Sequence, residues 1–148
     1  MKRIVSLALT LSLCLPAAWA APEQLPAVDL VSSSAVLMEK ETGQLLYEKE
    51  AHQRMEPASV TKIMTLLLIM EALDAGRIRR EDPVTISSTA AGMGGSQVYL
   101  EEGEQMSAGE LIKCITVVSG NDAAVAMAEH LAGSETAFVA QMNQRAQE

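Results

Sequence analysis

An apolar stretch in the middle of the chain constrains the fold most strongly. Residues 63–73 are apolar on nearly all sides of a helical wheel, which is typical of a helix that is buried on most of its faces. Pro57 marks the entrance to this helix, and the turn at residues 74–76 ends it. Such a helix needs other elements packed around it, so the stretch predicts a folded domain with this helix in its interior.

A serine and a lysine stand three residues apart where this helix begins. Positions i and i+3 share one helical face, so the hydroxyl of Ser59 can meet the amine of Lys62. A charged amine in a strongly apolar helix is costly unless it has partners, which favours Lys62 as a base, and outward-pointing helix amides near Ser59 would stabilise an oxyanion. The pair therefore indicates a nucleophile and its base. The alternative is a helix-capping serine followed by a solvated lysine.

A second candidate element is the tripeptide Ser119-Gly120-Asn121, which interrupts an apolar helical pattern. Ser119 offers a second hydroxyl for proton relay, and the amide of Asn121 can orient both a substrate and Lys62. The structural alternative is a simple turn between two helices, since glycine and asparagine tolerate unusual backbone angles. A buried helix and an interhelical turn can place the two elements on opposite walls of one cleft.

The remaining elements follow from short patterns and turn residues. Strand-like runs at residues 35–39 and 44–48 predict a hairpin, and Ser107 with Glu110 has the form of a capping box. The other expected elements are a strand at 83–87, a glycine-rich loop at 90–96, a helix from 108 to about 118, a helix at 123–131 capped by Asp122 and stopped by Gly133, and a last helix from a Ser134 cap that still continues at residue 147.

The first 20 residues have the pattern of a secretory signal peptide. Lys2 and Arg3 precede an apolar run at residues 4–15, and Ala18-Trp19-Ala20 predicts cleavage after Ala20. The apolar run is too short for a permanent transmembrane anchor. A lipoprotein with its lipid on Cys14 is the alternative, although the leucine directly before this cysteine fits lipid attachment poorly. We therefore expect an exported, periplasmic protein whose domain occupies residues 21–148.

Composition excludes several classes of function. Residues 21–148 carry nine basic and 19 acidic side chains, a net charge of −10, and no basic stripe, so we expect no nucleic-acid partner. Cys114 would be the one cysteine left after processing and could not form an intrachain disulfide. It lies five residues before Ser119 and could approach the cleft, but a buried, inert thiol is the preferred interpretation. His52 and His130 have no further ligands at metal spacing, so no metal or cofactor is expected.

Four blocks of sequence resemble one known family. They are Pro-Ala-Ser-Val-Thr-Lys-Ile-Met-Thr at 57–65, Ser-Gly-Asn-Asp-Ala-Ala at 119–124, Ala-Glu-His-Leu-Ala-Gly-Ser at 128–134 and Phe-Val-Ala-Gln-Met-Asn-Gln-Arg at 138–145. The chain resembles the penicillin-recognising serine acyltransferases. Among these it is similar to the low-molecular-mass penicillin-binding proteins, the type-5 and type-6 D-alanyl-D-alanine carboxypeptidases.

This resemblance implies an α+β, β-lactamase/transpeptidase-like fold, with helices packed on an antiparallel sheet. It implies that Ser59 is the acyl-accepting nucleophile, Lys62 the general base, Ser119 a proton relay and Asn121 a substrate-binding residue. The implied reaction removes the terminal D-alanine from peptidoglycan stem peptides, and β-lactams would acylate the same serine. The family also implies attachment to the inner-membrane surface through a C-terminal anchor.

One family feature is missing from the sequence. The family's third motif, a Lys-Thr-Gly strand that binds the substrate carboxylate and completes the oxyanion hole, does not occur in residues 1–148. We therefore expect a truncated chain that contains the signal peptide and the N-terminal part of the catalytic domain. Two alternatives stay open: a β-lactamase of the same superfamily, and a non-catalytic fragment.

Overall fold

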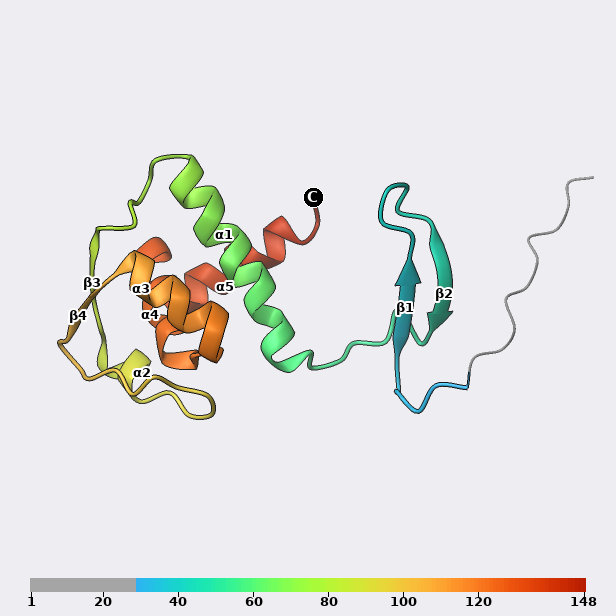
Figure 1. The fold of residues 1–148 in the computed structure, drawn as a ribbon, viewed down its shortest axis with the longest axis horizontal. Coiled ribbons are helices and arrows are strands. Elements are labelled where there is room, and N and C mark those ends of the chain that lie inside the picture. Colours follow the sequence, from blue (N-terminus) through green and yellow to red (C-terminus); the bar gives the residue numbers. More distant parts are fainter. Residues whose placement is uncertain (1–28) are drawn as a thin grey trace, which may run out of the picture. The chain divides into compact units, whose positions relative to one another are not determined.

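The computed structural model describes residues 29–148, and the signal peptide predicted for residues 1–20 lies outside them (Figure 1). The chain divides into two compact units, one ending at Arg54 and one formed by residues 55–148. No helix of the described part is both long and apolar enough to cross a membrane.

The first unit contains the predicted hairpin. Strands β1 (Ala35–Met38) and β2 (Leu45–Lys49) pair antiparallel, with Ala35 opposite Lys49 and a bulge after Leu37. At the open end of the hairpin the Ser34 hydroxyl donates a hydrogen bond to the carbonyl of Glu50 (3.1 Å). The hairpin prediction is confirmed.

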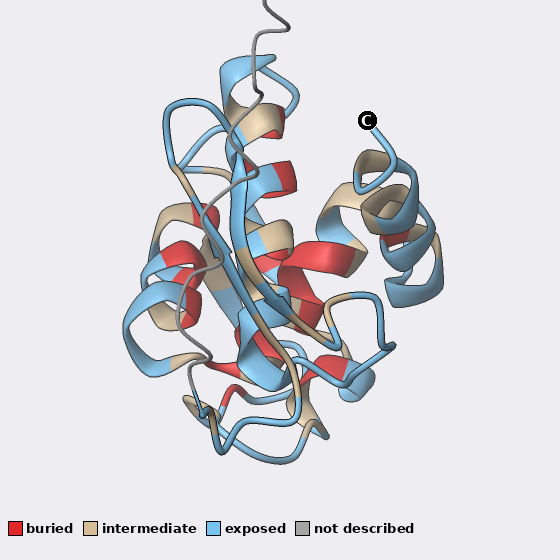
Figure 2. Ribbon diagram, turned by 90° about the vertical axis from the view of Figure 1, so that its right-hand side faces the viewer, coloured by how far each residue is buried: buried red, intermediate tan, exposed pale blue. Residues whose placement is uncertain are grey.

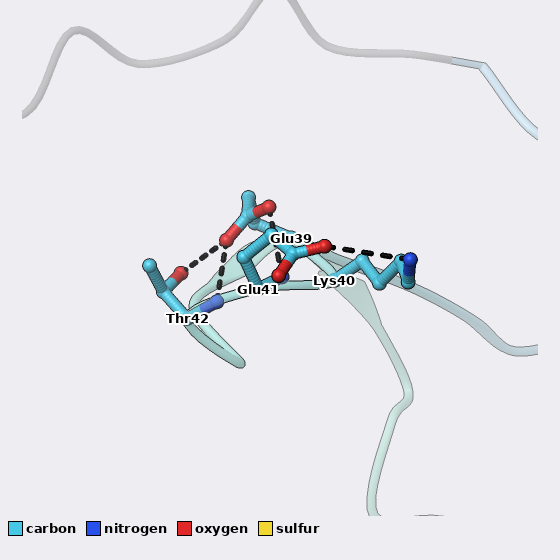
Figure 3. Close-up of polar contacts among 4 residues, drawn as sticks. All are labelled: Glu39, Lys40, Glu41 and Thr42. Atoms are coloured by element: carbon cyan, nitrogen blue, oxygen red, sulfur yellow. Dashed lines mark hydrogen bonds and ion pairs between the residues drawn. The ribbon is translucent and has the colours of Figure 1, made fainter.

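Glu39 organises the hairpin turn (Figure 3). Its carboxylate accepts hydrogen bonds from the backbone N–H of Glu41 (2.9 Å) and from the N–H and hydroxyl of Thr42 (2.6 and 2.5 Å). These donors, with the Glu41 N–H first, hold the pKa of Glu39 below its ordinary value. The neighbouring Lys40–Glu41 ion pair (3.4 Å) is largely exposed.

The second unit is mainly helical, with one two-stranded sheet (Figure 1). In chain order its elements are the 3₁₀ helix η1 (Ala58–Thr61), α1 (Lys62–Asp74), β3 (Pro83–Thr85), α2 (Ser88–Ala91), β4 (Gln105–Ser107), α3 (Ala108–Lys113), the π-helical turn η2 (Cys114–Val118), α4 (Asn121–Ala132) and α5 (Glu135–Arg145).

The core of this unit lies where α1, α3, α4 and the small sheet meet. Ile69 and Ala72 of α1, Leu111 of α3 and Met127 of α4 are completely inaccessible to solvent, and Val84 of β3 packs with them. Figure 2 shows the buried segments gathered where these helices face one another. Helix α4 therefore holds the unit together, because α1, α3 and strand β3 of the sheet all pack against it.

Helix α1 is less buried than its sequence predicts. Thr65, Leu68, Ile69 and Ala72 are buried, but a stripe at i, i+4 and i+7 spacing is exposed: Ile63, Leu67 and Met70. The expectation of a helix buried on most sides is therefore wrong for the described residues. The reason is that α4 and α5 pack against one face of the helix, while no other helix or strand of the second unit covers the exposed stripe.

Several other expectations need correction. Residues 90 and 91, expected in a loop, belong to α2, because the hydroxyl of Ser87 caps this helix by accepting the N–H of Ala90 (3.0 Å). Strand β4 was not expected, since Gln-Met-Ser has no strand pattern and is fixed by pairing with β3. The last helix ends at Arg145 and not at residue 147.

The caps of the later helices are mostly confirmed. The capping box of Ser107 and Glu110 opens α3, the Ser134 hydroxyl accepts the N–H of Ala137 (3.1 Å), and Gly133 ends α4 in the left-handed conformation. The predicted cap at Asp122 is wrong. Helix α4 starts at Asn121 with Gly120 as its N-cap residue, and the buried Asp122 carboxyl bonds to another segment.

Candidate active site

Ser59 and Lys62 meet where η1 joins α1. In a 3₁₀ helix the side chains at i and i+3 eclipse one another, and the Ser59 Oγ lies 3.4 Å from the Lys62 Nζ. The residue before the serine, Ala58, has a φ of +48°, in the left-handed region that non-glycine residues rarely adopt. Backbone strain of this kind persists only where the surroundings impose it, and it is common at functional sites.

Asn121 approaches the same lysine from the first residue of α4. The half-buried Lys62 Nζ donates a hydrogen bond to the Asn121 Oδ1 (2.5 Å), which links two helices across 59 positions of sequence. Lys62 therefore stands between the serine hydroxyl and the asparagine amide. A lysine in this position can take a proton from the hydroxyl while the amide fixes its orientation.

The orientation of the Asn121 amide is set by the glycine-rich segment at residues 94–96. The Nδ2 of Asn121 donates to the carbonyl of Gly94 (2.6 Å), and its backbone N–H donates to the carbonyl of Ser96 (2.7 Å). Between these carbonyls, Gly95 has a φ of +82°, and a Cβ there would lie 2.8 Å from the Asn121 Nδ2. A glycine is thus required both for the backbone angle and for the close approach.

Ser119 lies at the exit of the π-helical turn, with a φ of +58°. The chain then bends through Gly120, whose N–H donates to the Cys114 carbonyl (3.2 Å). Among the described residues the Ser119 hydroxyl has no hydrogen-bond partner, and Ser119 is not one of the residues that line the cleft. The structure thus joins Ser59, Lys62 and Asn121 by hydrogen bonds, in which Ser119 takes no part.

A cleft of about 370 Å³ opens beside this cluster. Its polar lining residues are Ser59, Thr61, Lys62, Thr65, Asn121 and Glu135. Helices α4 and α5 supply an apolar wall: Ala124, Val125, Ala128, Phe138, Val139 and Met142. An acyl group or a short peptide could lie against this wall with its carbonyl near Ser59.

Cys114 does not line the cleft and packs against the core. Burial raises the pKa of its thiol, and the carboxylates of Asp122 and Glu110 raise it further. A thiol with a raised pKa is a poor nucleophile, in agreement with the interpretation of Cys114 as inert. No group of three or more His, Cys, Asp or Glu side chains within residues 29–148 is arranged to hold a metal.

Sequence reasoning missed the part of the site that comes from the backbone. The carbonyls of Gly94 and Ser96, which accept the N–H groups of Asn121, have no motif of their own. The only signal in the sequence is the glycine at position 95, since a glycine in a loop can mark a close approach of the backbone to another group.

Comparison with solved structures gives the class of protein first. The mixed α+β fold matches penicillin-binding protein 5 from Haemophilus influenzae with a TM-score of 0.77 and 37% identity, over 83% of this chain and 37% of that one. It also matches penicillin-binding protein D2 from Listeria monocytogenes in the ampicillin-bound form, with a TM-score of 0.71 and 27% identity, over 83% of this chain and 48% of that one.

The family follows from sequence. The family model for D-alanyl-D-alanine carboxypeptidases of peptidase family S11 matches residues 20–148, and the chain belongs to this family. D-alanyl-D-alanine carboxypeptidase DacF of Bacillus subtilis (strain 168) is 56% identical over 117 residues, which are 79% of this chain and 30% of that protein. The chain thus spans about a third of the length of this relative.

Proposed function

We propose that this chain carries the nucleophile of a serine-type D-alanyl-D-alanine carboxypeptidase that acts on peptidoglycan stem peptides. The observation that carries the proposal is the position of the Lys62 Nζ, within reach of both the Ser59 Oγ (3.4 Å) and the Asn121 Oδ1 (2.5 Å). Family membership supports the same chemistry.

In the proposed reaction the Ser59 Oγ attacks the carbonyl carbon of the penultimate D-alanine, and its proton passes to Lys62. The C–N bond to the terminal D-alanine breaks, and the departing amine receives a proton, with Ser119 as the proposed relay. Water then hydrolyses the acyl ester on Ser59 and regenerates the hydroxyl. Asn121 binds the substrate backbone and holds Lys62 in place.

The same serine is proposed to react with β-lactams, whose strained amide mimics the scissile bond. The ampicillin-bound structure of the Listeria relative supports this part of the proposal. We further propose that the protein is exported by its N-terminal signal sequence and works in the periplasm, at the surface of the inner membrane. No metal or organic cofactor takes part in the proposed chemistry.

Rates on two substrates distinguish a carboxypeptidase from a β-lactamase. We expect the intact protein that contains this chain to release D-alanine from diacetyl-Lys-D-Ala-D-Ala and to hydrolyse benzylpenicillin much more slowly, leaving a long-lived acyl-enzyme. Both rates are measured on the same preparation. Rapid penicillin hydrolysis without D-alanine release would instead support the β-lactamase alternative.

The missing Lys-Thr-Gly triplet favours a second proposal for residues 21–148 on their own. We propose that these residues alone are a non-catalytic fragment without substantial carboxypeptidase activity. A lost oxyanion-hole donor typically reduces the rate by about 100- to 1,000-fold. We therefore expect residues 21–148 to release D-alanine at least 100-fold more slowly than the intact protein. Equal turnover would show that the third motif is not needed here.

A further inference from the structure

Asp122 is a completely buried carboxyl group in the first turn of α4, next to Asn121. Its Oδ2 accepts the backbone N–H groups of Val98 (2.9 Å) and Leu100 (3.2 Å), and its Oδ1 accepts the N–H of Ala123 (2.8 Å). A buried carboxyl that holds two amides from a distant segment anchors that segment firmly, because charge-assisted hydrogen bonds are the strong ones.

The anchored segment is held in an unfavourable conformation. Between the two bonded amides, Tyr99 has a φ of +61° and is 82% exposed. A bulky residue in the left-handed region is a genuine outlier, and such strain persists only where the surroundings impose it. The two bonds to Asp122 lie on either side of Tyr99 and therefore restrain the backbone on both sides of this residue.

The same segment also fixes Asn121. The carbonyls of Gly94 and Ser96 accept the side-chain and backbone N–H groups of Asn121. Asn121 and Asp122 are consecutive residues, so they clasp residues 94–100 at two points, one next to the site and one in the core. If the core point is released, the two carbonyls are no longer fixed, and the Asn121 amide can rotate its oxygen away from Lys62.

We propose that Asp122 is a positioning residue for the acylation step: through residues 94–100 it fixes the amide of Asn121 and, through that amide, the amine of Lys62. This inference rests on the proposed function for its catalytic part. Asp122 itself lies outside the cleft and touches neither the reacting serine nor its base.

The test is a double-mutant cycle on the rate of acylation by a fluorescent penicillin in the intact protein. We expect Asp122→Ala to slow acylation by about 100-fold, since a misplacement of about 1 Å can have such an effect. Asp122→Asn should slow it less, because its amide oxygen can still accept both N–H groups. In an Asn121→Ala background neither change should slow acylation further, because the residue through which Asp122 acts is gone.

Glu129→Gln is the matched control. Glu129 is another partly buried carboxylate of α4, and it accepts the Ser87 hydroxyl (2.6 Å) to tie α4 to the start of α2. A loss of general stability would affect Glu129→Gln and Asp122→Asn alike. Because Glu129 does not hold residues 94–100, we expect Glu129→Gln to be acylated at a rate within about twofold of that of the unmodified protein. If it slows acylation as much as Asp122→Asn does, or if the effects of Asp122 and Asn121 are additive, the positioning role is overturned.

Hydrogen exchange gives a readout that needs no catalysis. In Asp122→Ala we expect faster exchange of the amides of residues 96–100 and of Asn121, and unchanged exchange of α1. If the unmodified protein is not acylated at all, the proposed function fails, and the exchange data still decide whether Asp122 anchors the segment. Unchanged exchange of residues 96–100 in Asp122→Ala would overturn the anchor itself.

Discussion

Asn121 is the residue on which the geometry of the candidate site depends. Its amide oxygen meets Lys62, while its two N–H donors are fixed by backbone carbonyls of residues 94 and 96. With both ends of the amide occupied by different partners, a rotation of the amide would break two hydrogen bonds at once. The position of Lys62 is therefore fixed by a side chain with little freedom of its own.

Gly95→Ala tests whether residues 94–96 hold the Asn121 amide in place. The left-handed backbone should cost about 1–2 kcal/mol of stability, and the new methyl group would stand 2.8 Å from the Asn121 Nδ2. We expect acylation by penicillin to slow by on the order of 10- to 100-fold. Gly103→Ala is the control, since Gly103 has a φ of +79° and open space around its Cβ position. Equal acylation rates in the two variants would contradict the account.

How far the sequence predicts the site depends on the distance over which each residue acts. Ser59 and Lys62 are predictable because three positions along a helix bring them together. The meeting of Lys62 with Asn121 was only a plausible consequence of the two helices facing each other. Asp122 was assigned to a cap, because an acidic residue at a helix start fits that role and its burial against Val98 and Leu100 comes from tertiary packing.

At the scale of elements, local hydrogen bonds determine where helices start. The capping box of Ser107 and Glu110 opens α3, and the Ser107 hydroxyl and backbone N–H hold the pKa of Glu110 below its ordinary value. Local chemistry of this kind is readable from sequence. Strand β4 is not, because it is set by its pairing with a strand that is distant in sequence. The π-helical turn η2 has no local pattern that predicts it either.

Ser107→Ala tests the importance of the capping box. Removing the hydroxyl leaves the N–H of Glu110 without its acceptor, which should lower the free energy of unfolding by about 1 kcal/mol. Urea denaturation followed by circular dichroism measures the change. A midpoint identical to that of the unmodified protein would show that α3 does not need its cap.

The hairpin turn should loosen in acid. The folded-state pKa of Glu39 is lowered, so its contribution is fully present above the ordinary glutamate pKa of about 4.3 and is lost as the pH falls towards the lower folded value. Amide chemical shifts of residues 41 and 42 should follow this titration, and Glu39→Gln should show the loosened turn at neutral pH. Glu41→Gln, which removes only an exposed ion pair, is the control. A turn that is insensitive to both pH and Glu39→Gln would refute this role.

At the scale of the whole molecule, the second unit supports the site through contacts far from it. Arg145 near the end of α5 pairs with Glu71 near the end of α1 (3.0 Å), and Phe138 of α5 is buried against Leu68 of α1 and Ala128 of α4. These contacts fix α1 and α4 relative to each other, which in turn places Lys62 opposite Asn121. The α+β class and most of the helices were predictable, whereas the exposed stripe of α1 was not.

The central claim is that Ser59, activated by Lys62, is the residue that becomes acylated. Covalent labelling by a fluorescent penicillin, read on a denaturing gel and located by peptide mass spectrometry, tests it most directly. We predict that the label lies on Ser59, that Ser59→Ala abolishes labelling, and that Lys62→Ala slows it by several orders of magnitude, because an unactivated serine hydroxyl is a weak nucleophile. Undiminished labelling of the Ser59→Ala protein would contradict the account.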